Sequence, residues 1–131
     1  MRSFLFSTLI ATGLLTLSLP ASANELDVPI IEHGEYNDDS GGEILPTCTS
    51  STVTGLSKDG FLAVRAGPGS QYRKLAELHN GDVVYEFDHK GKWRGVVYGT
   101  PSVKCLTTKT RPVTYPNKGW VHSKWLEDLA G

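Results

Sequence analysis

Turn signals divide the chain from residue 51 onward into segments that are too short for helices of ordinary length. Glycine, proline and asparagine favour such turns, each for its own steric reason. The signals are Ser57-Lys58-Asp59-Gly60, Gly67-Pro68-Gly69, Asn80-Gly81 and Lys90-Gly91-Lys92. Between them, apolar residues alternate with polar ones at the period of two that is typical of a strand. The sequence therefore predicts an all-β fold. The expected elements are strands at 51–56, 61–66, 74–79, 82–89, 93–98 and 119–122, and one helical turn at 123–126 capped by Ser123.

The same pattern predicts one hairpin and the residues of the interior. Asn80-Gly81 is a strong signal for a tight hairpin because both residues tolerate positive φ, so the strand at 82–89 is expected to pair with the strand at 74–79. Trp120 is expected to be mainly structural, because so large a ring in so small a domain belongs at least partly to the core. The aliphatic residues expected in the interior are Leu62, Val64, Leu75, Leu78, Val83 and Val121.

Length and composition limit the chain to one small domain. It has 131 residues, of which 39% are hydrophobic and 21% are charged, as is typical of a globular protein. Its 14 glycines and 7 prolines argue against a helical bundle. The formal net charge is −1, so no overall field favours nucleic acid or an anionic membrane as a partner.

Residues 1–23 have the pattern of a secretory signal peptide. Arg2 precedes an apolar run of 16 residues, Phe4 to Leu19, and Ala21 and Ala23 occupy the positions that a signal peptidase reads. The alternative, a membrane anchor, would need about 20 apolar residues. We therefore expect cleavage after Ala23 and an exported protein, periplasmic or secreted, with no membrane anchor after cleavage.

Cys48 and Cys105 are the two cysteines of the chain. Exported proteins with two cysteines most often pair them, so a structural disulfide is expected. With 56 residues between the cysteines, the chain-entropy model gives a stabilisation of about 4 kcal/mol. A catalytic thiol is the alternative, but neither cysteine belongs to a recognisable nucleophile motif. A metal site would require more ligands.

Charge divides the exported chain into two parts. Residues 24–47 hold seven acidic side chains and no lysine or arginine, whereas residues 48–131 hold 12 basic and 7 acidic ones. The apolar residues of 24–47 are too few to bury a core of their own, so this segment is expected to be an acidic disordered tail. Its cluster of acidic and histidine side chains has no calcium-loop spacing, so no metal is expected. The cluster consists of Glu32, His33, Glu35, Asp38 and Asp39.

The chain resembles the bacterial SH3-like (SH3b) domain family. The residues that carry the resemblance are Leu62-Ala63-Val64-Arg65-Ala66-Gly67-Pro68-Gly69-Ser70-Gln71-Tyr72, then Leu75, Leu78, Asn80-Gly81, Val83 and Trp93, and finally Gly119-Trp120-Val121-His122-Ser123 with Leu126. The resemblance covers residues 51–126. It implies that residues 48–131 form a small SH3-like barrel of five to seven short strands with a short helical turn near the C-terminus.

The sequence departs from that family between residues 99 and 118. Ordinary members join the corresponding strands by a short turn, whereas here 20 residues intervene, with four basic side chains and no acidic one. Long loops in compact domains usually have a function or are mobile. Val103, Leu106 and Val113 are expected to form an extra hairpin within this insertion.

No catalytic motif is present in the folded part, so an enzyme is not expected and no cofactor is implied. The resemblance implies binding of the cell wall, often through its peptide part. Aromatic rings and arginines suit sugars and carboxylates together. The expected ligand residues are Tyr72, Trp93, Tyr98 and Tyr115 with Arg65, Arg73, Arg94 and Arg111.

Two kinds of partner therefore remain. The first is peptidoglycan or its peptide part. The second is an envelope protein, if the chain acts as an inhibitor or immunity factor against a wall hydrolase or toxin. Nucleic acid is not expected as a partner of an exported chain. The sequence does not indicate an oligomeric state.

Overall fold

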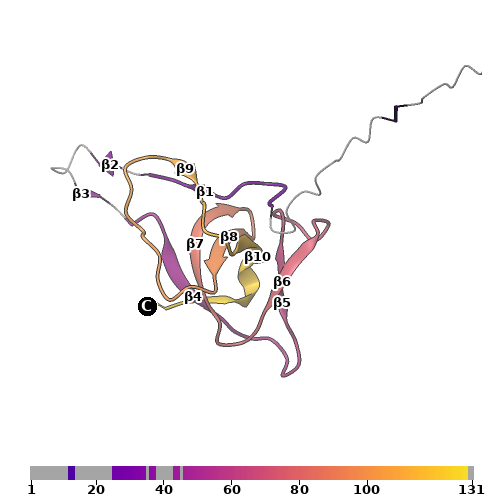
Figure 1. Ribbon diagram of the computed structural model, residues 1–131. Coiled ribbons are helices and arrows are strands. Elements are labelled where there is room, and N and C mark those ends of the chain that lie inside the picture. The colour runs from indigo at the N-terminus through magenta and orange to yellow at the C-terminus, as the bar shows by residue number, and fades with distance from the viewer. Residues whose placement is uncertain (1–11, 14–24, 35, 38–42, 45, 130–131) are drawn as a thin grey trace, which may run out of the picture.

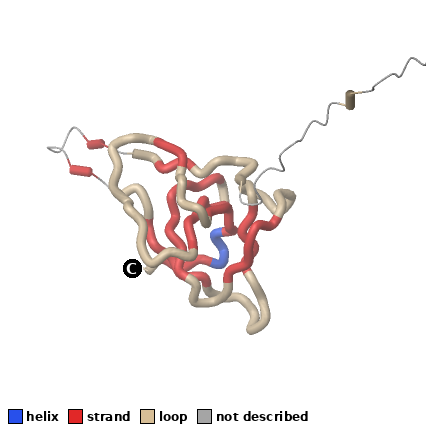
Figure 2. Tube along the Cα trace, viewed as in Figure 1, coloured by secondary structure: helices blue, strands red, loops and turns tan. Residues whose placement is uncertain are grey.

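The computed structural model describes residues 12–13, 25–34, 36–37, 43–44 and 46–129. These residues form one seven-stranded sheet, two two-stranded sheets and a short 3-10 helix, which confirms the predicted all-β class (Figure 1; Figure 2). The elements are β1 (Ile31–Glu32), β2 (Tyr36–Asn37), β3 (Glu43–Ile44), β4 (Thr49–Val53), β5 (Leu62–Arg65), β6 (Lys74–Leu78), β7 (Val83–Lys90), β8 (Trp93–Tyr98), β9 (Arg111–Pro112), β10 (Lys118–His122), the 3-10 helix Ser123–Trp125 and β11 (Leu126–Asp128).

The main sheet has the strand order β11-β4-β7-β8-β10-β5-β6, and all its neighbouring strands are antiparallel. Its seven strands agree with the expected five to seven. However, β11 and β6 are free edges, and no sheet in the described part of the chain is closed. The expected SH3-like barrel is therefore not confirmed by the strand pairing.

The first hydrophobic core lies on one face of the main sheet and follows the predicted alternation. Its buried residues are Val53, Leu62, Val64, Leu78, Val84, Val96 and Val121. The prediction was wrong in β7, where Val84 is fully buried and Val83 is 41% exposed. The two valines are adjacent, and a shift of one residue exchanges the two faces of a strand. Leu75 is also only partly buried.

The second core lies on the opposite face, because successive residues of a strand point to opposite sides. In β8, Val96 belongs to the first core and Val97 to the second, and in β10 Val121 and Trp120 are divided in the same way. Both faces of these two strands are therefore covered. The buried residues of the second core are Ile30, Cys48, Phe87, Val97, Val113 and Trp120.

Residues 25–34 form part of this second core, so the predicted disorder of residues 24–47 is wrong for this segment. Ile30 is 1% exposed, and a Cβ added to Gly95 of β8 would lie 2.8 Å from its Cγ2. Trp120 Nε1 donates a hydrogen bond to the Val28 carbonyl at 2.9 Å. The apolar run at 28–31 is too small for a core of its own, but it completes one whose other half lies on the sheet.

The remainder of the predicted tail is described only in part. β2 pairs with β3 in a separate two-stranded sheet, and residues 46 and 47 lead into β4. Residues 24, 35, 38–42 and 45 lie outside the described residues.

The insertion at 99–118 does not form the predicted hairpin. Its one strand in the described chain, β9, pairs with β1 in the register Ile31↔Pro112 and Glu32↔Arg111 (Figure 1). The Val113 N–H donates to the Ile30 carbonyl at 2.9 Å, and Leu106 is 62% exposed. A partner strand about 80 residues earlier in the chain thus replaces the expected local one.

The predicted hairpin at Asn80-Gly81 is also wrong, because β6 pairs only with β5 and β7 lies between β4 and β8. A turn does form, with φ of 93° at Gly81 and an Asp82 N–H to His79 carbonyl hydrogen bond of 3.0 Å. The Asn80 side chain accepts from the Leu56 N–H at 3.1 Å and donates to the Leu56 carbonyl at 2.9 Å. These bonds hold the turn against the loop after β4, and the two strands diverge.

The helical turn is present, but its cap is not the predicted Ser123. His122 is the N-cap, and its Nδ1 accepts from the Lys124 N–H at 3.1 Å. The predicted signal peptide at 1–23 lies outside the described residues except for 12–13. Among the residues that the structure describes, no helix is long and apolar enough to span a membrane.

Candidate functional site

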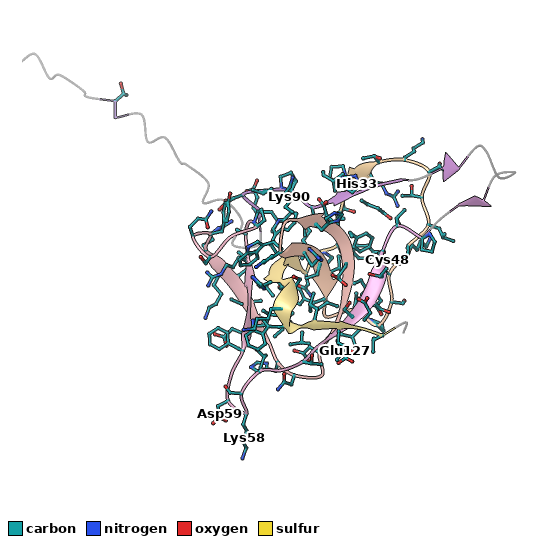
Figure 3. All side chains as sticks on the ribbon, turned by 180° about the vertical axis from the view of Figure 1, so that it is seen from behind. His33, Cys48, Lys58, Asp59, Lys90 and Glu127 are labelled. Atoms are coloured by element: carbon teal, nitrogen blue, oxygen red, sulfur yellow. A yellow bond between two sulfur atoms is a disulfide. The ribbon has the colours of Figure 1, made fainter. Side chains whose placement is uncertain are left out.

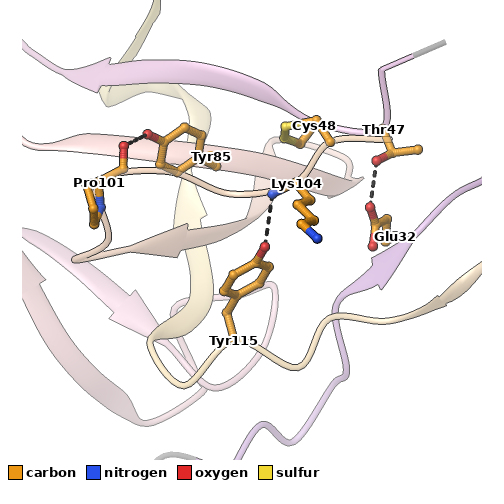
Figure 4. The surroundings of a disulfide bond; sticks show 8 residues. Glu32, Thr47, Cys48, Tyr85, Pro101, Lys104 and Tyr115 are labelled. Atoms are coloured by element: carbon orange, nitrogen blue, oxygen red, sulfur yellow. Dashed lines mark hydrogen bonds between the residues drawn. A yellow bond between two sulfur atoms is a disulfide. The ribbon is translucent and has the colours of Figure 1, made fainter. Parts of the chain in front are cut away.

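The predicted disulfide between Cys48 and Cys105 is confirmed, and it fastens the insertion to the residue before β4. Beside it, the Thr47 N–H donates to the Cys105 carbonyl at 2.6 Å. The Tyr85 hydroxyl donates to the Pro101 carbonyl at 2.9 Å (Figure 4). The first half of the insertion is thus held at two places. A disulfide is typical of an oxidising compartment outside the cytoplasm.

The predicted ligand residues are distributed over several parts of the fold. Most of them lie at or near the ends of strands. Arg65, Tyr72 and Arg73 surround the turn from β5 to β6, Trp93 and Arg94 begin β8, Tyr98 ends β8, Arg111 lies in β9, and Tyr115 follows β9.

The residues at the β5–β6 turn have structural partners. Arg65 Nη1 donates to the Tyr72 carbonyl at 2.9 Å. The Arg73 guanidinium donates to the Glu25 carbonyl, and its Nη2 lies 3.8 Å from Asp27 Oδ1. Arg73 therefore holds the N-terminal segment against the sheet. None of the three lines the cavities around the insertion.

The start of β8 is tied to its neighbours. Arg94 Nε lies 3.4 Å from Glu86 Oε1 on β7, and the Trp93 ring packs edge-on against His122 at 5.5 Å between centroids. Arg94 borders a cavity of about 220 Å³ that also includes the buried Asp88. The Asp88 carboxylate accepts from the Ile31 N–H at 3.0 Å, and Arg94 is paired with Glu86, so both of these charged groups already have partners in the fold.

The structure brings predicted ligand residues together in two cavities: Tyr98 and Tyr115 line one, and Tyr115 and Arg111 line the other. Burial raises the pKa of Tyr98 above its ordinary 10.0. The Tyr115 hydroxyl accepts from the Lys104 N–H at 3.0 Å, which fixes its ring. The cavity that Tyr98 and Tyr115 share measures about 200 Å³, and its other lining residues are Val97, Gly99, Thr100, Pro116 and Asn117.

Each of these tyrosines also borders a second cavity. Tyr98 lines one of about 380 Å³ with Leu78, Asp82, Val83, Gly99, Thr100 and Pro101. Tyr115 lines another of about 380 Å³ with Glu32, Lys104, Arg111, Pro112, Val113 and Thr114. Because they share lining residues, the three cavities are adjacent. We call their lining the insertion face: Glu32, Leu78, Asp82, Val83, 97–101, Lys104 and 111–117.

Three charged residues of the insertion face, Glu32, Asp82 and Lys104, were not among the predicted ligand residues. Lys104 was one of several basic residues in the insertion, although its place beside Cys105 marked it as the one held by the disulfide. Glu32 was assigned to the disordered tail, yet it is 4% exposed and its Oε2 lies 3.1 Å from Arg111 Nε. The apolar run just before Glu32 was the signal that this carboxylate begins a packed segment.

The histidines do not converge on a catalytic arrangement within the described ranges. His79 and His89 are exposed, and His33 Nε2 lies 3.1 Å from Asp88 Oδ1. His33 lies at the opposite end of the molecule from the projecting loop that carries Lys58 and Asp59 (Figure 3). In this part of the chain, no group of three or more His, Cys, Asp or Glu side chains is placed to hold a metal ion. Glu35, Asp38 and Asp39 of the acidic cluster lie outside it.

In comparisons with protein-family models, curated proteins and solved structures, nothing matches this chain. Its family and function must therefore be inferred from its own residues and geometry. The insertion face is the strongest candidate site, because it combines adjacent cavities, two tyrosines and cationic side chains on a segment held by a disulfide.

Proposed function

We propose that this protein is an exported, non-enzymatic binding module that recognises cell-wall peptidoglycan through the insertion face. The observation that carries the proposal is the cavity of about 200 Å³ that Tyr98 and Tyr115 line together, beside Lys104 and Arg111. Peptidoglycan combines sugar rings with peptides that bear carboxylates. Aromatic rings offer apolar contact area to sugars, and lysine and arginine bind carboxylates.

Polar side chains in the same cavity support a carbohydrate ligand. The Thr100 hydroxyl and the Asn117 amide can each donate and accept hydrogen bonds, as sugar hydroxyls require. The Tyr98 phenol is protonated at neutral pH and can donate a hydrogen bond as well. Ligand sites usually combine apolar area with a few placed polar groups in this way.

We also propose that the main sheet is a relative of the SH3b fold. Two separate parts of the resemblance support this, because Leu62–Arg65 forms β5, the segment with Gly119-Trp120-Val121 forms β10, and these strands pair at Trp120↔Arg65. In this proposal, residues 25–34 and the insertion at 99–118 are additions that cover one face of the sheet. The signal peptide at 1–23 and export belong to the same proposal, and the disulfide supports them.

Co-sedimentation of the purified protein with peptidoglycan sacculi tests the function. Tyr98→Ala and Tyr115→Ala should each lower the affinity about tenfold or more, as expected for aromatic residues at the centre of a site. Phe61→Ala is the matched control, because Phe61 is an aromatic residue that is 46% exposed outside the insertion face. Tyr115→Phe should retain most of the binding, because it keeps the ring.

The same assay can contradict the proposal in two ways. If the wild-type protein stays in solution with sacculi, peptidoglycan is not the ligand. If Tyr72→Ala removes binding while Tyr115→Ala does not, the ligand binds at the β5–β6 turn instead. Circular dichroism of each variant separates a lost contact from a lost fold.

An envelope protein is the second candidate partner, and one observation favours it. Leu106 follows Cys105 and is 62% exposed, so an apolar side chain projects from a loop that the disulfide holds. Apolar anchors on restrained loops are typical of protein-binding surfaces. Leu106→Asp should abolish capture of a wall hydrolase or toxin by this surface and leave sacculus binding unchanged. If Leu106→Asp instead abolishes sacculus binding and leaves capture of the protein unchanged, Leu106 belongs to the wall-binding site.

A further inference from the structure

The cavity beside Tyr115 holds more positive than negative charge. Its lining includes Lys104 and Arg111 but only one carboxylate, that of Glu32. At about 380 Å³, it has room for a peptide end of one or two small residues. The net positive charge of the lining indicates an anionic ligand.

Glu32 is not available to a cation from solution. It is 4% exposed, its Oε1 accepts from the Thr47 hydroxyl at 2.6 Å, and its Oε2 accepts from Arg111 Nε at 3.1 Å. A carboxylate bonded in this way orients the guanidinium. Its role in the cavity is therefore to position Arg111.

The donors that remain point to a carboxylate as the bound group. The contact with Glu32 uses only Nε of Arg111, whose side chain is 55% exposed. Within the described residues, the two Nη atoms of Arg111 and the Nζ of Lys104 have no hydrogen-bond or ion-pair partner. A guanidinium edge and an ammonium group together match the two oxygens of a carboxylate.

The wall beside these donors is apolar. Val113 is 6% exposed and packs in the second core, and the Tyr115 ring is fixed because its hydroxyl accepts from the Lys104 N–H at 3.0 Å. Pro112 completes this side of the cavity. The anion should therefore be attached to a small apolar group, as it is at a peptide chain end.

The disulfide holds both sides of the cavity in place. Thr47, which binds Glu32, precedes Cys48, and Lys104 precedes Cys105 (Figure 4). The disulfide thus restrains both Lys104 and Glu32, the carboxylate that orients Arg111. Such preorganisation lowers the entropic cost of binding.

We infer that this cavity binds the free C-terminal carboxylate of a short peptide whose last residue is small and apolar, with Lys104 and Arg111 as the anion contacts. The inference rests on the proposed function in one respect, because it takes the peptide part of the cell wall as the source. It extends that function by naming the recognised group and by assigning Lys104, Arg111 and Glu32 separate roles.

Calorimetric titration with N-acetyl-D-alanyl-D-alanine and with its C-terminal amide tests the inference. The acid should bind, and the amide should bind about tenfold more weakly or worse, because it lacks the charge that the cations recognise. Lys104→Gln should weaken binding of the acid about tenfold. Lys109→Gln removes the same charge from an exposed lysine in the same loop that does not line the cavity, and it should leave the affinity unchanged.

Glu32→Gln gives a result that a merely structural role would not produce. The glutamine amide oxygen can still accept from Arg111 Nε and orient the guanidinium, but the negative charge is gone, so affinity for the acid should rise about threefold or more rather than fall. If this variant does not fold, as judged by circular dichroism, the comparison of Lys104→Gln with Lys109→Gln decides the question.

Two outcomes would overturn the carboxylate site, and a third would overturn the cell wall as the source of the peptide. Equal affinity for the acid and the amide would exclude recognition of a carboxylate. Equal effects of Lys104→Gln and Lys109→Gln would exclude Lys104 as a contact. Equal or tighter binding of the L-alanyl-L-alanine acid would move the source from the cell wall to a protein chain end.

Sacculus binding is measured independently of these titrations, so the two proposals can fail separately. If the protein binds sacculi but binds the acid and the amide equally, the wall-binding function stands and the carboxylate site is excluded. If the protein binds the acid but does not bind sacculi, the carboxylate site stands and the wall-binding function is excluded.

Discussion

The two faces of the main sheet are covered by different kinds of structure. On the first face, side chains from strands of the sheet itself pack against one another, as Val64 of β5, Val84 of β7 and Val96 of β8 do. On the second face, Val97 and Trp120 are covered by Ile30 and Val113, which belong to segments outside the sheet. The part of the insertion face around Val97, Val113 and Tyr115 lies on this second side, whereas Leu78 and Tyr98 pack with the first core.

The segments that cover the second face come from distant parts of the sequence. The bond between Trp120 and Val28 joins residues 92 positions apart, and the ion pair of Arg111 with Glu32 joins residues 79 apart. Closing loops of this length costs entropy, and the pairing of β4 with β11 in the main sheet carries a similar cost. The segments on the second face, however, are not hydrogen-bonded into the main sheet as strands, so they depend on the disulfide and on large buried side chains. Loss of these segments should affect binding before it affects the rest of the sheet.

The largest expected effect is that of Trp120→Ala. Trp120 is fully buried, and its Nε1 bonds to the Val28 carbonyl, so the substitution leaves a cavity and an unpaired acceptor. We expect a loss of about 5 kcal/mol in the free energy of unfolding, measured in denaturant. Val121→Ala, the adjacent residue on the first face, should cost about 2 kcal/mol. Equal costs would mean that the second face depends no more on Trp120 than the first face depends on Val121.

Removal of the disulfide should have the next largest effect. The double variant Cys48→Ser with Cys105→Ser opens a link between residues 57 apart, and the expected loss is about 4 kcal/mol in the free energy of unfolding. Hydrogen exchange should rise most at β9 and in the insertion and least in β5 and β8. A uniform rise over all strands would show that the bridge stabilises the whole sheet rather than its second face.

Ile30→Ala should have a smaller and more local effect. Ile30 is 1% exposed and fills the space above Gly95, so truncation should cost about 3 kcal/mol in the free energy of unfolding. Limited proteolysis should then cut within 25–34 sooner than anywhere in β4 to β8. Unchanged resistance of this segment would mean that its hydrogen bonds, rather than Ile30, hold it on the sheet.

The smallest effect concerns the pH dependence of Tyr98, which packs against the first core and also lines the insertion face. Burial raises its pKa, so above pH 10 the unfolded chain releases this proton more readily than the folded protein does. The free energy of unfolding should therefore fall as the pH rises above 10, and Tyr98→Phe should lessen that fall. Denaturant unfolding at pH 9 and pH 11 measures the difference.

Much of the first face was predictable from the sequence. β8 covers the expected residues 93–98, and Lys90-Gly91-Lys92 forms the expected turn, with φ of 59° at Gly91. The error at Val83 and Val84 arose because both residues are valine, so alternation alone does not identify the one that faces the core. The failed hairpin at Asn80 had a different cause, because its side chain bonds to Leu56 and not within the turn.

The candidate site was predictable only as a set of residue types. Tyr98, Tyr115 and Arg111 were expected in the site and do line the insertion face, whereas Arg65, Tyr72 and Arg73 do not. Aromatic and cationic residues occur throughout the domain, and the sequence alone does not indicate which of them already have partners. Arg73 and Arg94 hold Asp27 and Glu86, which only spatial proximity reveals.

The sequence by itself determined the all-β class, the turn positions and the pairing of Cys48 with Cys105, because alternation, turn residues and two cysteines are local or exclusive signals. Only the tertiary structure decided that residues 25–34 are part of the fold and that the insertion pairs with them. An apolar run too short to bury itself becomes ordered when another segment offers a complementary surface. That surface exists only after the sheet has formed, so the run indicates that the segment can be buried but not where.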